Sequence, residues 1–327
     1  MTIFLFIIRR GKMDNFAQTC EEILDNMEEV MVGKREVLEE ALTCFLAGGH
    51  LLLEDVPGVG KTMLARSLAV SSGAKFRRVQ CTPDLLPKDI TGITVYHQET
   101  EEFEFSPGPI FSQVLLVDEV NRATPKTQSG LLESMAEGQV TIDGETKILP
   151  EPFFVIATQN PVEFDGTFPL PKAQLDRFMM KTSMGYPGQD DEVQILEQVK
   201  QEHPIKSLQS VTTPEKIEEL KKKVRQVHVA EKVANYLVKI VSKTRNHPDI
   251  VLGASPRGSI DLYHTAQARA LLKGREFVTP DDVKSLAKSV LSHRLVVKSE
   301  SQLRGTEAEN LIDKILKKVS VPVLQEE

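Results

Sequence analysis

Short apolar runs recur through the first half of the chain, with helical or irregular sequence between them. The first, third and fourth runs are nearly continuous in apolar residues, which is typical of strands buried on both faces of a sheet. Alternation of such strands with helices predicts an α/β fold with a parallel five-stranded sheet and right-handed crossovers. The runs are 50-HLLLE-54, 76-FRRVQ-80, 114-VLLVD-118, 153-FFVIAT-158 and 179-MMKTS-183.

Two further segments alternate polar and apolar residues and predict hairpins that project from this core. They are 92-GITVYHQETEEFEF-105 and 138-GQVTIDGETKILP-150, and the second contains the tight-turn pair Asp143-Gly144. Before the first strand, apolar residues at helical spacing predict two helices over residues 13–47, separated at Val32-Gly33.

Residues 1–12 have a different pattern from the rest of the chain. Their apolar run, Ile3–Ile8, is too short to span a bilayer. Basic residues come after the run instead of before it, and no small-residue cleavage site appears, so a secretory signal is not indicated. We expect residues 1–12 to be an upstream-start extension or a flexible tail, with no stable membrane insertion.

After Gly188 the strand pattern disappears and helix-start signals take over. Thr213-Pro214, Ser255-Pro256 and Thr279-Pro280 each place an N-cap residue before a proline at the first helical position. The sequence therefore predicts an α/β domain over residues 13–188 and a small all-helical domain over residues 189–327.

The charge balance argues against a general nucleic-acid binder. The formal net charge is −7, and the segment 92–105 carries four glutamates with no lysine or arginine. The three cysteines, Cys20, Cys44 and Cys81, lack metal-site spacing, which favours reduced thiols in a cytoplasmic protein.

The segment 55-DVPGVGKT-62, between the first strand and a helix, has the composition of a phosphate-binding loop. Gly58 and Gly60 permit inward-facing N–H groups, Lys61 supplies a cation for the outer phosphates, and Thr62 offers a hydroxyl to Mg²⁺. Asp55 stands where the pattern GxxxxGK[ST] has its first glycine. We expect Asp55 to turn the chain in the left-handed region, with its side chain away from the phosphates.

Polar residues follow two other predicted strands at the same edge of the sheet, where α/β proteins bind ligands. Asp118 is a candidate Mg²⁺ ligand, and Glu119 is a candidate base that polarises the attacking water. Asn160, after the fourth strand, is placed to hold that water. Arg177, before the last strand, and Arg257, at the start of a predicted helix, are candidate phosphate-facing cations.

These motifs together resemble the MoxR family of AAA+ ATPases. The resemblance rests on the order of the hairpin insertions and on four segments: 119-EVNRA-123, 133-ESMAEGQVTIDG-144, 158-TQNPVEFDGTFPLPKAQLDRF-178 and 254-ASPRG-258. It implies an AAA+ P-loop core with a helical lid, and ATP and Mg²⁺ as cofactors. It also implies catalytic roles for Lys61 and Glu119. Asn160 would act as sensor 1, and Arg177 would act as the arginine finger. Thr62 and Asp118 would bind the Mg²⁺ ion. The implied nucleotide-contacting set is Val32, Gly33, Asp55, Val56, Pro57, Gly58, Val59, Gly60, Lys61, Thr62, Met63, Asp118 and Arg257.

By the same resemblance, the chain is expected to form a homo-oligomer, a hexameric ring, that remodels or activates a client or a protein with a von Willebrand factor A domain. A magnesium-chelatase-type motor subunit, which shares both hairpin insertions, is the alternative. A nucleic-acid motor is a third interpretation, which the acidic first hairpin disfavours.

Overall fold

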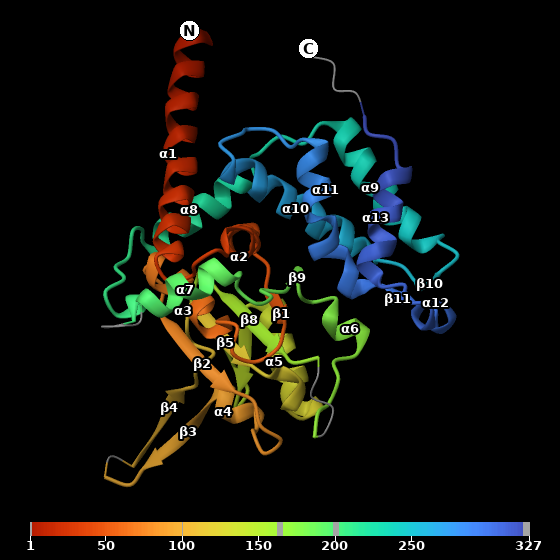
Figure 1. Ribbon diagram of the computed structural model, residues 1–327. Coiled ribbons are helices and arrows are strands. Elements are labelled where there is room, and N and C mark those ends of the chain that lie inside the picture. Colours follow the sequence, from red (N-terminus) through yellow and green to blue (C-terminus); the bar gives the residue numbers. More distant parts are fainter. Residues whose placement is uncertain (1, 100, 162–165, 199–202, 323–327) are drawn as a thin grey trace.

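The computed structural model describes residues 2–99, 101–161, 166–198 and 203–322. Its centre is a five-stranded sheet in the order β2-β5-β8-β1-β9, and every pairing within it is parallel. The predicted α/β class and sheet are confirmed (Figure 1). The strands are β1 (Leu51–Glu54), β2 (Phe76–Gln80), β5 (Val114–Asp118), β8 (Phe154–Gln159) and β9 (Met180–Thr182).

The sheet is covered on both faces, as its apolar strands require. Alternate residues of one strand enter different hydrophobic cores: Leu116 lies in the larger core and Leu115 and Val117 lie in the smaller one. Helices α4 (Pro87–Thr91) and α5 (Pro125–Glu137) cover the smaller core. Helices α1 (Thr2–Glu28), α2 (Arg35–Ala47) and α3 (Lys61–Ser71) supply residues to the larger one.

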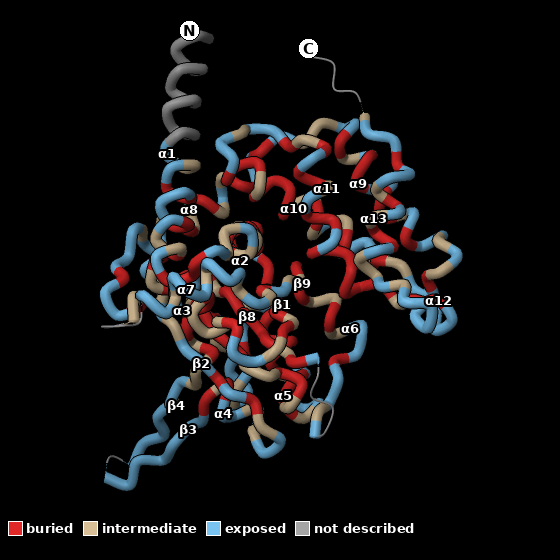
Figure 2. Tube along the Cα trace, in the orientation of Figure 1, coloured by how far each residue is buried: buried red, intermediate tan, exposed pale blue. Residues whose placement is uncertain are grey.

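Both predicted hairpins are present. The first pairs β3 (Gly92–His97) with β4 (Glu102–Pro107), and the second pairs β6 (Gln139–Ile142) with β7 (Glu145–Ile148). The β3–β4 hairpin projects from the body of the molecule and is almost entirely exposed (Figures 1 and 2).

The C-terminal part of the chain is helical, with one departure from the sequence expectation. The three predicted N-caps are confirmed, because the hydroxyls of Thr213, Ser255 and Thr279 each accept a hydrogen bond from a backbone N–H in the first turn of the helix. The expected all-helical domain also contains a two-stranded antiparallel sheet of β10 (Ile250–Leu252) and β11 (Val296–Val297). Strands of two and three residues are too short to produce a recognisable alternation, so the sequence did not predict them.

The remaining elements comprise two short helices of the α/β core, which precede β9, and the helices that follow β9. They are the α-helices α6 (Lys172–Leu175), α7 (Gln189–Gln198), α8 (Pro214–Val224), α9 (Glu231–Arg245), α10 (Pro256–Leu272), α11 (Pro280–Leu291), α12 (Ser299–Leu303) and α13 (Ala308–Lys318), and the 3-10 helices η1 (Val120–Arg122), η2 (Pro204–Lys206) and η3 (Ser292–Arg294).

The N-terminal helices join the two parts of the molecule. Helix α2 contributes Leu38 and Leu42 to the same hydrophobic core as Leu262 of α10 and Leu51 of β1. Helix α1 begins at Thr2, so residues 2–12, for which we expected an extension or flexible tail, continue a helix (Figure 1).

Two further expectations concern membrane-spanning helices and the cysteines. Among the described residues, no helix has both the length and the apolar character needed to cross a membrane. Cys20, Cys44 and Cys81 are buried free thiols, as expected. Burial, together with the nearby charges of Asp118 and Glu119, raises the pKa of the Cys81 thiol to about 12, so this group stays protonated near neutral pH.

Candidate nucleotide-binding site

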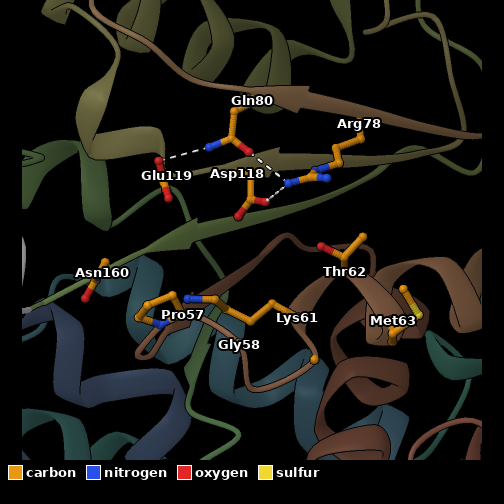
Figure 3. A pocket seen from close by; sticks show the side chains of 11 residues that line it. Pro57, Gly58, Lys61, Thr62, Met63, Arg78, Gln80, Asp118, Glu119 and Asn160 are labelled. Atoms are coloured by element: carbon orange, nitrogen blue, oxygen red, sulfur yellow. Dashed lines mark hydrogen bonds and ion pairs between the residues drawn. The ribbon is translucent and has the colours of Figure 1, made fainter. Parts of the chain in front are cut away.

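The carboxyl ends of the central strands and the loop after β1 enclose a cavity of about 390 Å³ (Figure 3). Most of the candidate residues that the sequence indicated from β1, β5 and β8 meet here. The cavity is lined by Pro57, Gly58, Gly60, Lys61, Thr62, Met63, Arg78, Gln80, Asp118, Glu119 and Asn160.

The loop between β1 and α3 has the properties of an anion site. Gly58 and Gly60 both lie in the left-handed region, with φ of 86° and 98°, where a side chain would be strained. Gly60 is the N-cap of α3 and has no side chain to bond the first N–H groups of the helix. Those N–H groups, the positive end of the helix dipole and Lys61 together favour a phosphate at this position.

Asp118 and Glu119 lie opposite this loop, at the end of β5. The Thr158 hydroxyl donates to Asp118 Oδ1 over 2.6 Å and accepts from the backbone N–H of Glu119 over 2.8 Å, so β8 fixes both acids. Glu119 has a left-handed backbone, with φ of 54°. Such a conformation costs a non-glycine residue of order 1–3 kcal/mol and is concentrated at functional sites.

The sequence did not single out Arg78 and Gln80, which come from β2 and line the same cavity. Arg78 Nη2 donates to Asp118 Oδ2 over 2.7 Å, and Gln80 Nε2 donates to Glu119 Oε2 over 2.9 Å (Figure 3). The parallel register pairs Gln80 with Asp118, which brings these side chains to the acids. Their two-residue spacing on the run 76-FRRVQ-80 places them on one face, and this was the signal available in the sequence.

Asp55 does not have the left-handed backbone that we expected. The described non-glycine residues with positive φ are Glu101, Glu119 and Asp143, so that expectation is wrong. Asp55 continues the strand instead, since its N–H donates to the carbonyl of Gln159 over 3.2 Å. Its side chain is outside the cavity lining and is 7% exposed. Because the backbone of Asp55 is not left-handed, a glycine is not required here.

The two remaining arginines lie elsewhere. Neither Arg177 nor Arg257 lines the cavity. Asp176 precedes Arg177 directly, and Ser255 lies two residues before Arg257. The Ser255 hydroxyl donates to Asp176 over 3.1 Å, so both arginines lie near one junction between the α/β core and the helical part. Arg257 is exposed and Arg177 is half-buried. Four other expected contact residues, Val32, Gly33, Val56 and Val59, also lie outside the lining.

Comparison with known proteins agrees with this geometry. Residues 50–180 match the family model "ATPase family associated with various cellular activities (AAA)", and residues 242–315 match the AAA lid domain. The chain is 38% identical over 314 residues to the chaperone MoxR1 of Mycobacterium tuberculosis, covering 93% of this chain and 82% of that protein. The chain belongs to the MoxR family of AAA+ ATPases. The protein YeaC of Bacillus subtilis is 51% identical over 300 residues, covering 92% of this chain and 94% of that protein.

A solved structure supports the same assignment for the whole fold. A crystal structure from Cytophaga hutchinsonii superposes with a TM-score of 0.91 and 36% sequence identity, and the match covers 97% of this chain and 99% of that one. The expected MoxR resemblance and the AAA+ core with a helical lid are therefore confirmed.

The donor set of this MoxR family site also suits a hydrated magnesium ion. Among the described residues, no three His, Cys, Asp or Glu side chains gather as a preformed metal site. Mg²⁺ in phosphate-transfer sites keeps several waters and takes one or two protein oxygens together with phosphate oxygens. The Asp118 carboxylate and the Thr62 hydroxyl both line the cavity and would supply those oxygens.

Proposed function

We propose that the chain hydrolyses ATP at this cavity and uses the cycle to remodel or activate partner proteins within a ring of identical subunits. The observation that carries this proposal is the convergence of Lys61, Asp118 and Glu119 on one cavity beside an uncapped helix N-terminus. A cation, a metal-binding acid and a candidate base in that arrangement are the parts that phosphoryl transfer needs.

Each side chain has a defined task in this mechanism. The Lys61 ammonium neutralises charge on the outer phosphates, and Asn160 holds the attacking water. Glu119 accepts the proton from that water as it attacks the γ-phosphate. When bound through Thr62 and Asp118, Mg²⁺ supplies further charge neutralisation on the phosphates.

The positions of Arg177 and Arg257 support the ring. Because both lie at the junction of core and lid and outside the cavity of their own subunit, we assign them to the nucleotide of a neighbouring subunit. An arginine supplied in this way stabilises the transition state only after assembly.

The hairpins support a protein partner. Tyr96 and Phe103 pack together on the β3–β4 hairpin with ring centroids 5.0 Å apart, and Phe103 is 74% exposed. The second hairpin lies against the first, since Thr94 donates to Asp143 over 2.6 Å and the Lys147 ammonium lies 4.7 Å from the centre of the Phe105 ring. We propose this acidic, aromatic pair of hairpins as the partner-contacting surface. Its chemistry, together with the identity to the chaperone MoxR1, favours a client protein or a von Willebrand factor A domain over a porphyrin pathway or a nucleic acid.

The function is tested by steady-state phosphate release from ATP and Mg²⁺, comparing the native chain with Glu119→Gln. The amide keeps the shape of the side chain but does not act as a base, so turnover should fall by about 10²–10⁴-fold. Binding of a non-hydrolysable ATP analogue, followed by calorimetry, should be retained. Turnover of Glu119→Gln within a few-fold of the native chain would remove Glu119 from the mechanism.

A further inference from the structure

The Asp55 carboxylate binds a segment that lies 128 to 130 residues further along the chain. Asp55 Oδ2 accepts hydrogen bonds from the Ser183 hydroxyl at 3.0 Å and from the backbone N–H groups of Met184 at 2.6 Å and Gly185 at 2.7 Å. Asp55 Oδ1 accepts from the N–H of Val56 at 2.9 Å. Every partner is a donor, so the position suits a group that only accepts, which an ionised carboxylate is.

The segment that Asp55 holds is the connection between the two parts of the molecule. Residues 183–188, which we name the linker, join β9 of the central sheet to α7, after which the chain enters the helical part. Lys34 binds the backbone carbonyls of the same linker. Its Nζ donates to the carbonyls of Met184 at 2.7 Å, Gly185 at 3.1 Å and Tyr186 at 2.9 Å. Asp55, at the start of the phosphate loop, and Lys34, next to Gly33, therefore hold one linker through its N–H and C=O groups.

The linker and the phosphate loop also share a hydrophobic core, which contains Met184 and Val59. A Cβ atom at Gly60 would lie 3.5 Å from the terminal methyl of Met184 and 3.4 Å from that of Met31. Met184 is buried. The phosphate loop and the linker are therefore joined by apolar packing as well as by hydrogen bonds.

Asp55 is connected to the nucleotide site by its backbone. Lys61 Nζ donates to the Asp55 carbonyl over 2.6 Å. A lysine ammonium has three donors, so phosphate oxygens can join or replace this carbonyl as acceptors when a nucleotide binds. One residue thus contacts the cation of the phosphate loop through its carbonyl and the linker through its carboxylate.

We propose that Asp55 is a positioning residue that couples nucleotide occupancy of the phosphate loop to the linker and, through the linker, to the helical part of the chain. The inference rests on the proposed nucleotide site but goes beyond it. A glycine at position 55 has no side chain with which to hold the linker, and an asparagine directs an N–H donor toward other donors. Only the carboxylate satisfies all four contacts.

The test is hydrogen–deuterium exchange of the full chain, measured with and without a non-hydrolysable ATP analogue and Mg²⁺, with calorimetry of the same samples. In the native chain, the analogue should change exchange in peptides covering residues 183–188 and α10. Asp55→Asn should raise exchange over residues 183–188 in both states and bind the analogue within about tenfold of the native affinity, which corresponds to 1.4 kcal/mol. In Asp55→Asn, the change in exchange that the analogue causes at residues 183–188 and α10 should be lost.

Two comparisons separate coupling from simple stabilisation. Ser183→Ala removes one donor to Asp55 and leaves the phosphate loop intact, so it should weaken the nucleotide-dependent difference, and it carries the test if Asp55→Asn does not fold. Asp190→Asn also replaces a carboxylate by an amide, at an exposed position of α7. The change in exchange that the analogue causes should be the same in this variant as in the native chain.

The outcomes that overturn the inference differ from those that overturn the function. If Asp55→Asn and Ser183→Ala bind the analogue and keep the native difference, Asp55 only stabilises the fold and the coupling is refuted. If the native chain binds the analogue but its linker and α10 do not respond, the inference fails and the nucleotide site stands. If the native chain does not bind the analogue, the proposed function fails, and the inference fails with it.

Discussion

The Arg78 guanidinium lies 2.7 Å from the carboxylate of Asp118, the residue that we expect to hold the magnesium shell. Arg78 is nearly half exposed, so this ion pair contributes roughly 0–1 kcal/mol. The Thr158 hydroxyl already donates to Asp118 Oδ1, so Arg78 and a hydrated Mg²⁺ would compete for the other oxygen, Oδ2. Binding of the metal would then displace Arg78 from Asp118.

We therefore expect Arg78→Gln to lower the Mg²⁺ concentration that gives half-maximal ATPase activity, by up to about five-fold given the small energy of an exposed pair. The measurement is a magnesium titration at fixed ATP. Arg77→Gln, the exposed neighbour on the same strand, is the control. A higher magnesium requirement in Arg78→Gln would show that Arg78 assists the metal or the phosphates instead of competing.

Lys61→Ala should abolish measurable nucleotide binding, because it removes the only lysine or arginine within the segment 55–62. Isothermal titration with a non-hydrolysable analogue and Mg²⁺ measures this directly. Lys75→Ala removes an exposed lysine outside the cavity and should bind as the native chain does. Near-native affinity of Lys61→Ala would mean that the loop after β1 is only a turn.

Removing the Arg294 side chain should lower the free energy of unfolding by more than removing an exposed cation. Its side chain is 1% exposed and pairs with Asp176 at 2.8 Å and with Asp261 at 2.5 Å, linking the core to α10. Removing one partner of a buried pair typically costs about 3–5 kcal/mol, because charge remains buried without compensation. The free energy of unfolding of Arg294→Ala, measured by urea denaturation, should be lower than that of the native chain by about 3–5 kcal/mol.

The matched control for Arg294 is Lys288→Ala. Lys288 pairs with Asp313 at 2.8 Å, but its side chain is 47% exposed. Such a pair contributes roughly 0–1 kcal/mol. If the two variants lose equal amounts of unfolding free energy, the Arg294 contacts are not the connection between core and lid that the structure indicates.

The sequence predicted those features that depend on local pattern. Continuous apolar runs such as 114–118 identified the strands, and chain order placed Lys61, Asp118 and Asn160 at one edge, because parallel strands end on the same side. The contacts of Asp55 were not predictable in this way. Its partners, residues 183–185, are far away along the chain, and no local pattern specifies that distance.

The register of the sheet explains the other omission. Arg78 and Gln80 become site residues only because β2 pairs with β5 so that Gln80 lies opposite Asp118. A shift of one residue would turn both side chains to the other face. The strand itself was predictable from its composition, whereas this pairing required the structure.

The central claim is that ATP hydrolysis takes place in a ring and needs Glu119 of one subunit with Arg177 of its neighbour. The decisive measurement mixes two inactive variants, Arg177→Ala and Glu119→Gln, and records phosphate release per subunit. Each alone should bind ATP and hydrolyse it poorly, since an arginine supplied in trans is worth about 10³–10⁵ in rate. Mixed rings should recover part of the native activity, because some interfaces pair an intact Glu119 with an intact Arg177. If the two variants form mixed rings and remain inactive together, Arg177 does not act on the neighbouring site and the account is wrong.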